Sequence, residues 1–84
     1  YKIYIGKNDL TEVDFVVETN DELVYIQVAL SVRDEGTLER ELRPLESIND
    51  HFRKYIITLD YDTNIYNGIK QISAMDFLTG RVDI

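Results

Sequence analysis

Cysteine is absent from the 84 residues of this chain. The chain therefore has no disulfide framework, no thiolate metal site and no cysteine nucleophile, and the disulfide-dense secreted scaffolds are excluded. No apolar run approaches the roughly 20 residues that a membrane-spanning helix needs, and no basic-then-apolar leader is present. We therefore expect a soluble, cytoplasmic domain without membrane contact.

Positive charge is also scarce, because 9 Lys and Arg residues stand against 16 Asp and Glu residues, for a net charge of −7. This balance disfavours nucleic-acid binding through counterion displacement, although it leaves a local site open. Five basic residues gather in the middle third of the chain: Arg33, Arg40, Arg43, Arg53 and Lys54. Because acidic residues surround them, we interpret them as part of a solvated helix surface.

The rest of the composition is that of one small globular domain spanning residues 1–84, with 44% hydrophobic and 30% charged residues. The chain begins at Tyr1 within a strand-like pattern and without an initiator methionine. We therefore expect these residues to be a fragment of a longer polypeptide.

The segment from Glu12 to Leu30 predicts a β-hairpin, because two arms rich in Val, Ile, Phe and Tyr flank a polar cluster. Asn20 and Asp21, which both tolerate positive φ, are the expected central turn residues. This choice fixes which residues of the two arms face each other. One face is then wholly apolar: Val13 opposite Val28, Phe15 opposite Ile26, and Val17 opposite Val24. The other face is mixed: Glu12 opposite Ala29, Asp14 opposite Gln27, Val16 opposite Tyr25, and Glu18 opposite Leu23.

A helix is predicted after the hairpin, since apolar residues recur at spacings of three and four. They are Leu38, Leu42, Leu45, Ile48 and Phe52. Asp34 is the expected N-cap, and Asn49 and Asp50 are expected to end the helix. Pro44 predicts either a kink near Arg43 or a second short helix that has the proline in its first turn.

The second half of the chain predicts two further strands and a short helix. Arg53 to Asp60 contains a continuous β-branched and aromatic run without alternation, which is typical of a central strand covered on both faces. It should lie parallel to the second hairpin arm, because a helical crossover connects the two. Asp60 to Gly68 is expected to be a polar loop, and Ile69 to Ile72 a short strand. Ser73 is the expected N-cap of a short helix that Gly80 ends.

Together these elements predict an α/β domain with a mixed sheet. Tyr1 to Gly6 alternates as a first strand and completes an antiparallel meander with the hairpin. The apolar stripe of the long helix should pack on one sheet face, while Asp14 and Gln27 lie on the other. That second face should need another segment to cover three of its residues: Val16, Leu23 and Tyr25.

Several short strings carry a resemblance to a known family. They are Gly6-Lys7, Glu12–Val16 (EVDFV), Tyr25–Val28 (YIQV), Glu39–Glu41 with Leu45, Tyr55–Asp60, and Gly68-Ile69 through Asp76–Leu78. With the strand and helix order, they resemble the PD-(D/E)XK nuclease superfamily, which has a restriction-endonuclease-like fold. More closely, the chain resembles a nuclease-like C-terminal module, of unknown function, of prokaryotic AAA-type P-loop ATPases.

The resemblance implies where a metal site would lie. In active members, a first Asp and a Glu placed two residues before a Lys hold a divalent metal, and the Lys assists the attacking water. Asp14 matches the first Asp, whereas Gln27 stands in place of the Glu and Ala29 in place of the Lys. Asp14 and Gln27 are thus the candidate Mg²⁺ ligands, and Glu12 could supply a second carboxylate. The alternative is that Asp14 and Gln27 form a structural cross-strand pair in which the amide donates to the carboxylate.

The function implied is an accessory or interaction module of an AAA-type ATPase, with a degenerate, non-catalytic site. ATP would bind only in an upstream module, because these residues contain no GxxxxGK[ST] loop. The expected partner is a protein, either the module's own ATPase or another chain. The alternatives are a Mg²⁺-dependent nucleic-acid phosphodiesterase and a plain protein-binding or dimerisation module. His51, Asp60 and Asp62 are interpreted as helix-end and turn residues.

Overall fold

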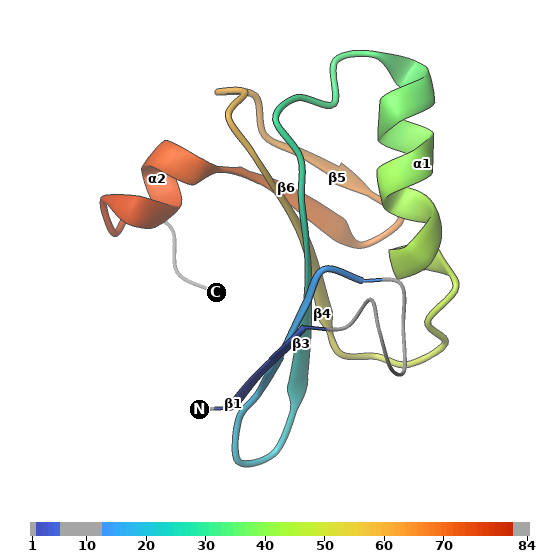
Figure 1. Ribbon diagram of the computed structural model, residues 1–84, viewed down its shortest axis with the longest axis vertical. Coiled ribbons are helices and arrows are strands. Elements are labelled where there is room, and N and C mark those ends of the chain that lie inside the picture. The colour runs from blue at the N-terminus through green and yellow to red at the C-terminus, as the bar shows by residue number, and fades with distance from the viewer. Residues whose placement is uncertain (1, 6–12, 82–84) are drawn as a thin grey trace.

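The structure is a computed structural model that describes residues 2–5 and 13–81. Its described elements are, in order, β1 (Lys2–Ile5), β2 (Phe15–Glu18), β3 (Leu23–Val28), α1 (Glu35–Glu46), β4 (Arg53–Thr58), β5 (Asn64–Tyr66), β6 (Ile69–Ser73) and α2 (Ala74–Leu78). The strands form one mixed sheet in the order β1-β2-β3-β4-β6-β5. Helix α1 lies on one side of this sheet and α2 on the other (Figure 1). The predicted α/β class with a mixed sheet is thus confirmed.

The hairpin of β2 and β3 has the predicted register. Phe15 pairs with Ile26 and Glu18 with Leu23, so that the expected partners face each other along the whole ladder. The turn geometry differs from the prediction, because neither Asn20 nor Asp21 has positive φ. The two arms still close on each other at the Thr19 amide, which donates to the Glu22 carbonyl at 3.0 Å.

The start of the hairpin departs from the predicted register. The β2–β3 ladder begins at Phe15, and Val13 is fully buried in the core cluster on the α1 side of the sheet. The expectation that Val13 faces Val28 on the apolar face was therefore wrong. Side chains replace the ladder here, since the Asp14 amide donates to Gln27 Oε1 and the Val28 amide donates to Asp14 Oδ2.

Helix α1 begins as predicted and ends earlier than predicted. Asp34 caps it, accepting from the Thr37 amide at 3.0 Å. The helix runs through Pro44 to Glu46 and is followed by Ser47, so neither a second helix nor an extension to residues 49–50 forms. Pro44 lies in the last turn, where its missing N–H leaves the Arg40 carbonyl without its usual helical donor, yet the helix continues to Glu46.

The face of the sheet on which α1 packs was predicted incorrectly. A core cluster joins Leu42 and Leu45 of α1 to strand residues that include Tyr25, Ile56 and Ile69. Tyr25 and Gln27 alternate onto the same side, so α1 covers the mixed face of the hairpin and not the wholly apolar one. We call this side the α1 face and the opposite side the open face. The β3–α1–β4 crossover decides the face through its handedness, which hydrophobic alternation alone does not specify.

The second half of the sheet confirms the predicted central strand. β4 is parallel to β3 on one side and to β6 on the other. Residues 64–66, expected to belong to a loop, form the edge strand β5, which pairs antiparallel with β6. Asn67 and Gly68 have φ of 51° and 85°, and they make the tight turn between these two strands. The three residues of this strand, Asn64, Ile65 and Tyr66, give too short a pattern to predict.

The terminal helix α2 begins after Ser73 and ends before Gly80, as predicted. Ser73 is at the N-cap but makes no side-chain capping bond, and its Oγ is buried without a partner among the described residues. Gly80 has φ of 79° and ends the helix as predicted, with the Arg81 amide donating to the Asp76 carbonyl at 2.8 Å. Within residues 2–5 and 13–81, no helix has the length and apolar character needed to cross a bilayer.

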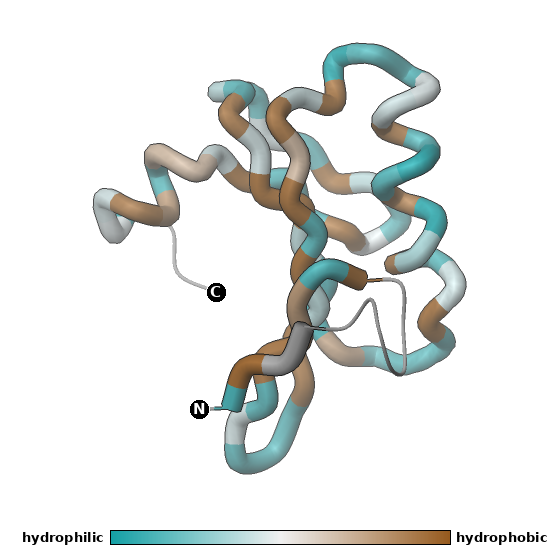
Figure 2. Tube along the Cα trace, in the orientation of Figure 1, coloured by the Kyte–Doolittle hydropathy of each residue, from teal (hydrophilic) through white to brown (hydrophobic). Residues whose placement is uncertain are grey.

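The hydrophobic core is divided between the two faces of the sheet. On the open face, a second cluster joins residues of β3, β4 and β6, with Ala74 of α2 packed against it. Its buried members are Val24, Ile26, Tyr55, Ile57 and Ile72. Figure 2 shows hydrophobic positions along the strands, whereas α1 alternates hydrophobic and hydrophilic positions. Helix α1 is therefore amphipathic, with its apolar stripe toward the sheet.

Candidate functional site

Asp14 and Gln27 lie together where β2 begins and β3 ends. The Asp14 amide donates to Gln27 Oε1 at 2.6 Å, and the Val28 amide donates to Asp14 Oδ2 at 2.9 Å. The two side chains thus each bond to the opposite backbone and continue the strand pairing beyond the ladder. The sequence predicted the proximity of Asp14 and Gln27 correctly. The direct bond from the amide to the carboxylate, expected for a structural pair, is replaced by these two backbone bonds.

The other end of the Gln27 amide contacts helix α1. Gln27 Nε2 lies 3.3 Å from the Glu41 carbonyl and 3.3 Å from Glu41 Oε1. Gln27 is only 3% exposed, so the amide is a buried link between β2, β3 and α1. A buried polar side chain is tolerated when its donors and acceptors have partners, and here both ends of the amide have them.

The arrangement is a poor fit to a divalent cation. A metal bound by Gln27 would need the Oε1 lone pairs that face the Asp14 amide, and Mg²⁺ prefers several oxygen ligands in octahedral geometry. Ala29 is partly buried against the α1-side cluster and supplies no charge. Glu12, the other candidate, lies outside the described residues. No group of three or more His, Cys, Asp or Glu side chains suited to a metal occurs among the residues that are described.

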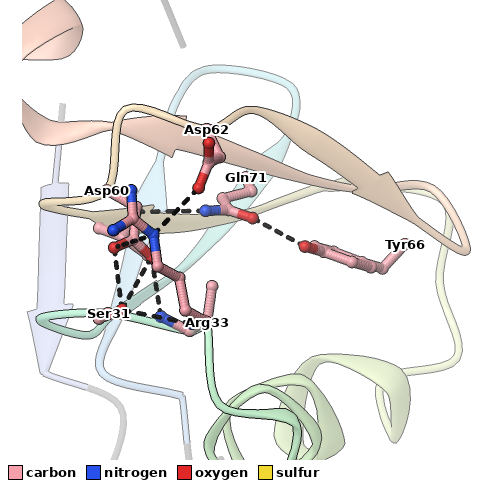
Figure 3. A network of polar contacts seen from close by, with 8 residues as sticks. Ser31, Arg33, Asp60, Asp62, Tyr66 and Gln71 are labelled. Carbon is pink, nitrogen blue, oxygen red and sulfur yellow. Dashed lines mark hydrogen bonds and ion pairs between the residues drawn. The ribbon is translucent and has the colours of Figure 1, made fainter.

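A second polar cluster occupies the carboxyl edge of the parallel strands, around Asp60 (Figure 3). Both Asp60 oxygens accept from Ser31 Oγ, at 2.9 and 3.1 Å, and Oδ2 also accepts from the Val32 amide at 2.9 Å. Arg33 Nε lies 3.5 Å from Asp60 and 3.2 Å from Asp62. Asp60 lies in the bend after β4, which agrees with its interpretation as a turn residue, but it is buried and bonded to the chain that follows β3.

The hydrogen bond from the Val32 amide is the main reason why the pKa of Asp60 is lowered, and Ser31 and Arg33 act in the same direction. The carboxylate therefore remains ionised and fixes the chain after β3 to the chain after β4. Asp62 agrees with its interpretation as a turn residue. It is exposed, and among the contacts of Figure 3 it meets only Arg33.

A cavity of about 200 Å³ lies next to this cluster, between the start of α1 and the β5–β6 edge. Gln71 is 3% exposed and forms part of its wall; its Oε1 accepts from Tyr66 Oη at 2.8 Å, and its Nε2 lies 3.4 Å from Thr58 Oγ1. Gln71 and Gln27 lie in register on either side of Ile56. Two buried amides thus flank one apolar residue beneath α1.

The opposite end of the α1 face carries a third polar group, around Tyr25. Tyr25 Oη donates to Asp50 Oδ2 at 2.7 Å, and Lys54 Nζ lies 3.0 Å from Asp50 Oδ1. Burial, together with the bond to Asp50, raises the pKa of Tyr25 to about 12. Burial works against ionisation of Asp50, but hydrogen bonds from Tyr25 and Lys54 produce a net lowering of its pKa.

His51 does not take the predicted position at a helix end, because α1 stops at Glu46. It is exposed, and its ring stacks on Phe52 with the centroids 4.7 Å apart. The basic residues also depart from the expected helix surface: Arg53 pairs with Glu22 and Lys54 with Asp50, and both are strand residues. Only Arg40 and Arg43 of that group lie on α1.

The comparisons with known proteins give one relative. A protein of Haemophilus influenzae, described as an uncharacterized protein, is 35% identical to this chain over 79 residues. The match covers 93% of this chain and 19% of the relative, so the chain spans about a fifth of that protein's length. No family model matches the chain, and no solved structure matches it.

The sequence did not predict the half-buried Glu41 as a partner of Gln27, nor the burial of Asp60 and Gln71. The signal for Glu41 was weak, since a glutamate on a helix usually faces solvent. Gln71 could have been found, because it alternates onto the same side as Ile69, whose apolar character marks a buried face. The polar residues that organise the α1 face thus come from β3, α1, β6 and the chain that follows β4.

Proposed function

We propose that this domain is an accessory or interaction module of a longer AAA-type P-loop ATPase, with a restriction-endonuclease-like fold and a degenerate, non-catalytic site. The observation that carries the proposal is the bonding of Gln27. At the position where the resemblance implies a metal-binding glutamate, an amide is held between the Asp14 amide and Glu41. An uncharged structural link therefore stands where active members of the superfamily have a charged metal ligand.

The strand arrangement supports the same proposal. An antiparallel meander followed by a helical crossover to a parallel central strand is the order that the resemblance implies. The relative supports the view that the module belongs to a longer protein, because 79 matched residues are only 19% of it. The ATP chemistry and the biological partners of the whole protein are part of the proposal.

The test is to restore the residues of the active superfamily. Gln27→Glu alone would bring a second carboxylate to within reach of Glu41, at the 3.3 Å now spanned by the amide bond. The restored variant should therefore combine Gln27→Glu and Ala29→Lys with Glu41→Gln, which keeps a hydrogen-bonding partner without like charge. Binding of Mg²⁺ and Mn²⁺ is measured by calorimetry, and nicking of plasmid DNA is the activity readout.

We expect the natural chain to show no metal-dependent nicking and the restored variant to gain metal affinity. Asp14→Ala in the restored background should abolish that gain, and Glu41→Gln alone is the matched control without a new ligand. Nicking by the natural chain that disappears in Asp14→Ala would overturn the proposal in favour of the Mg²⁺-dependent phosphodiesterase. A gene that encodes no P-loop upstream of these residues would contradict the ATPase context and favour a plain binding module.

A further inference from the structure

The open face of the sheet carries an unusual share of the exposed apolar surface. By strand alternation, six large hydrophobic residues on it are exposed by 38–79% of their surface. They are Ile3, Phe15, Val28, Leu30, Leu59 and Ile65. Three of the other four exposed large hydrophobics among the described residues are Met75, Phe77 and Leu78 of α2, and the fourth is Tyr61.

Val28, Leu30 and Leu59 form a strip at the carboxyl edge of β3 and β4. Ile3 and Ile65 lie farther out, on the edge strands β1 and β5. Leu30 and Leu59 are neighbours, since the Leu59 amide donates to the Leu30 carbonyl at 3.1 Å, and Val28 pairs with Ile57 just below them. Helix α2 covers only part of the face, where Ala74 packs on the buried cluster. A contiguous apolar surface of this kind marks an interaction site more often than a free surface.

The character of the central strands indicates what should cover the strip. β3, β4 and β6 form a parallel centre within the mixed sheet, and sheets made wholly of parallel strands are almost always covered by helices on both faces. The α1 face already has its helix, whereas α2 is five residues long. Lys70 alternates onto the open face next to Tyr55 and has no ion-pair partner among the described residues, so an acidic flank would complement it.

We propose that the open face is the docking surface for an amphipathic helix with an acidic flank, contributed by the rest of a longer polypeptide. The helix lies across β2, β3 and β4 and completes a third layer. The matched relative is long enough to contain such a helix, since about four fifths of its length lies outside the match. This inference rests on the proposed function only in that both place the domain within a longer protein.

The test uses the absence of cysteine from residues 1–84. Leu30→Cys and Leu59→Cys place single thiols on the strip, and Glu39→Cys places a control thiol on the exposed side of α1. Maleimide labelling of the peptide that carries each thiol is followed by mass spectrometry, in the 84-residue chain and in the full-length polypeptide that contains it. Circular dichroism checks that every variant is folded.

In the full-length polypeptide, labelling at the two leucine positions should slow by about tenfold or more, as expected for a contact that must open before reaction. Labelling of Glu39→Cys should not change. Equal rates for Leu30→Cys in the two proteins would overturn the docking surface. So would slowing in the 84-residue chain that increases with its concentration, because a second copy would then be the occupant. A full-length polypeptide that shows the slowed labelling but has no P-loop upstream of these residues would instead remove the proposed function and leave the docking surface in place.

Discussion

The two faces of the sheet differ in a way that hydrophobicity alone would not suggest. All five buried polar or charged residues of the described chain alternate onto the α1 face: Gln27, Thr58, Asp60, Gln71 and Ser73. The open face has an apolar centre, yet its margins are exposed, up to 79% at Leu30. The mixed face is the more fully covered one, because α1 packs on its apolar residues and supplies Glu41 as a partner for Gln27.

This difference shows that the connection between strands, more than the apolar content of a sheet face, decides which face a helix covers. The β3–α1–β4 crossover can place its helix on only one side if it is right-handed, and that side carries Gln27 and Tyr25. The hydrogen bonds of Gln27 to Glu41 and of Tyr25 to Asp50 are how the chain accommodates that placement. The apolar face has the stronger hydrophobic pattern and receives only the short α2.

The largest expected effect is on the free energy of unfolding, and it compares a buried leucine with an exposed one. Leu45 of α1 is fully buried against the sheet, whereas Leu30 is 79% exposed on the open face. Leu45→Ala should lower the free energy of unfolding by about 2–5 kcal/mol, from lost apolar burial and the cavity left behind. Leu30→Ala, the same chemical change, should cost less than about 0.5 kcal/mol in the 84-residue chain. Urea denaturation measures both.

The comparison would fail if Leu30→Ala cost as much as Leu45→Ala in the isolated chain. Such a result would mean that the open face is already covered in solution. Repeating the Leu30→Ala measurement at several protein concentrations identifies self-association as the cause if its cost rises with concentration.

The second effect concerns the buried amide. Gln27→Met keeps the side-chain volume but leaves the Asp14 amide without its 2.6 Å acceptor and Glu41 without its donor. We expect a loss of about 1–3 kcal/mol in the free energy of unfolding, the usual cost of an unsatisfied buried group. Lys70→Met on the open face is the matched control and should be close to neutral. A neutral Gln27→Met would show that the amide contributes nothing to joining α1 to the sheet.

Local features of the fold could be predicted because they depend on neighbouring residues. The hairpin register follows from alternation on both sides of the turn, the Asp34 cap from one side chain at a helix start, and the Gly80 stop from a positive φ. The face that α1 covers could not be predicted, since both faces of the hairpin carry enough apolar residues to accept a helix. The strand β5 was missed because three residues give too short a pattern.

The candidate site was predicted in its location more than in its chemistry. Asp14 and Gln27 do lie together, because hairpin register fixes which residues are opposite. Their actual partners include Glu41, which comes from a helix whose position depends on the crossover. The cluster around Asp60 needs the carboxyl ends of β3 and β4 side by side, and tertiary structure alone brings Ser31 to Asp60.

The smallest expected effect is a pH dependence that arises on the α1 face. Asp60 has a folded-state pKa below its ordinary value of 3.8, chiefly through the Val32 amide, so its ionised form stabilises the fold. That contribution is complete above the ordinary value and is lost as the pH falls through the lowered one. Asp60→Asn should therefore reduce stability at neutral pH and flatten the fall in stability below about pH 4. Asp50, whose pKa is also lowered, keeps part of the fall in that variant.

The urea midpoint between neutral pH and about pH 2.5 measures the effect, with Asp62→Asn, at an exposed partner of the same Arg33, as the matched control. Parallel curves for the natural chain and Asp60→Asn would show that the α1 face has no part in acid sensitivity.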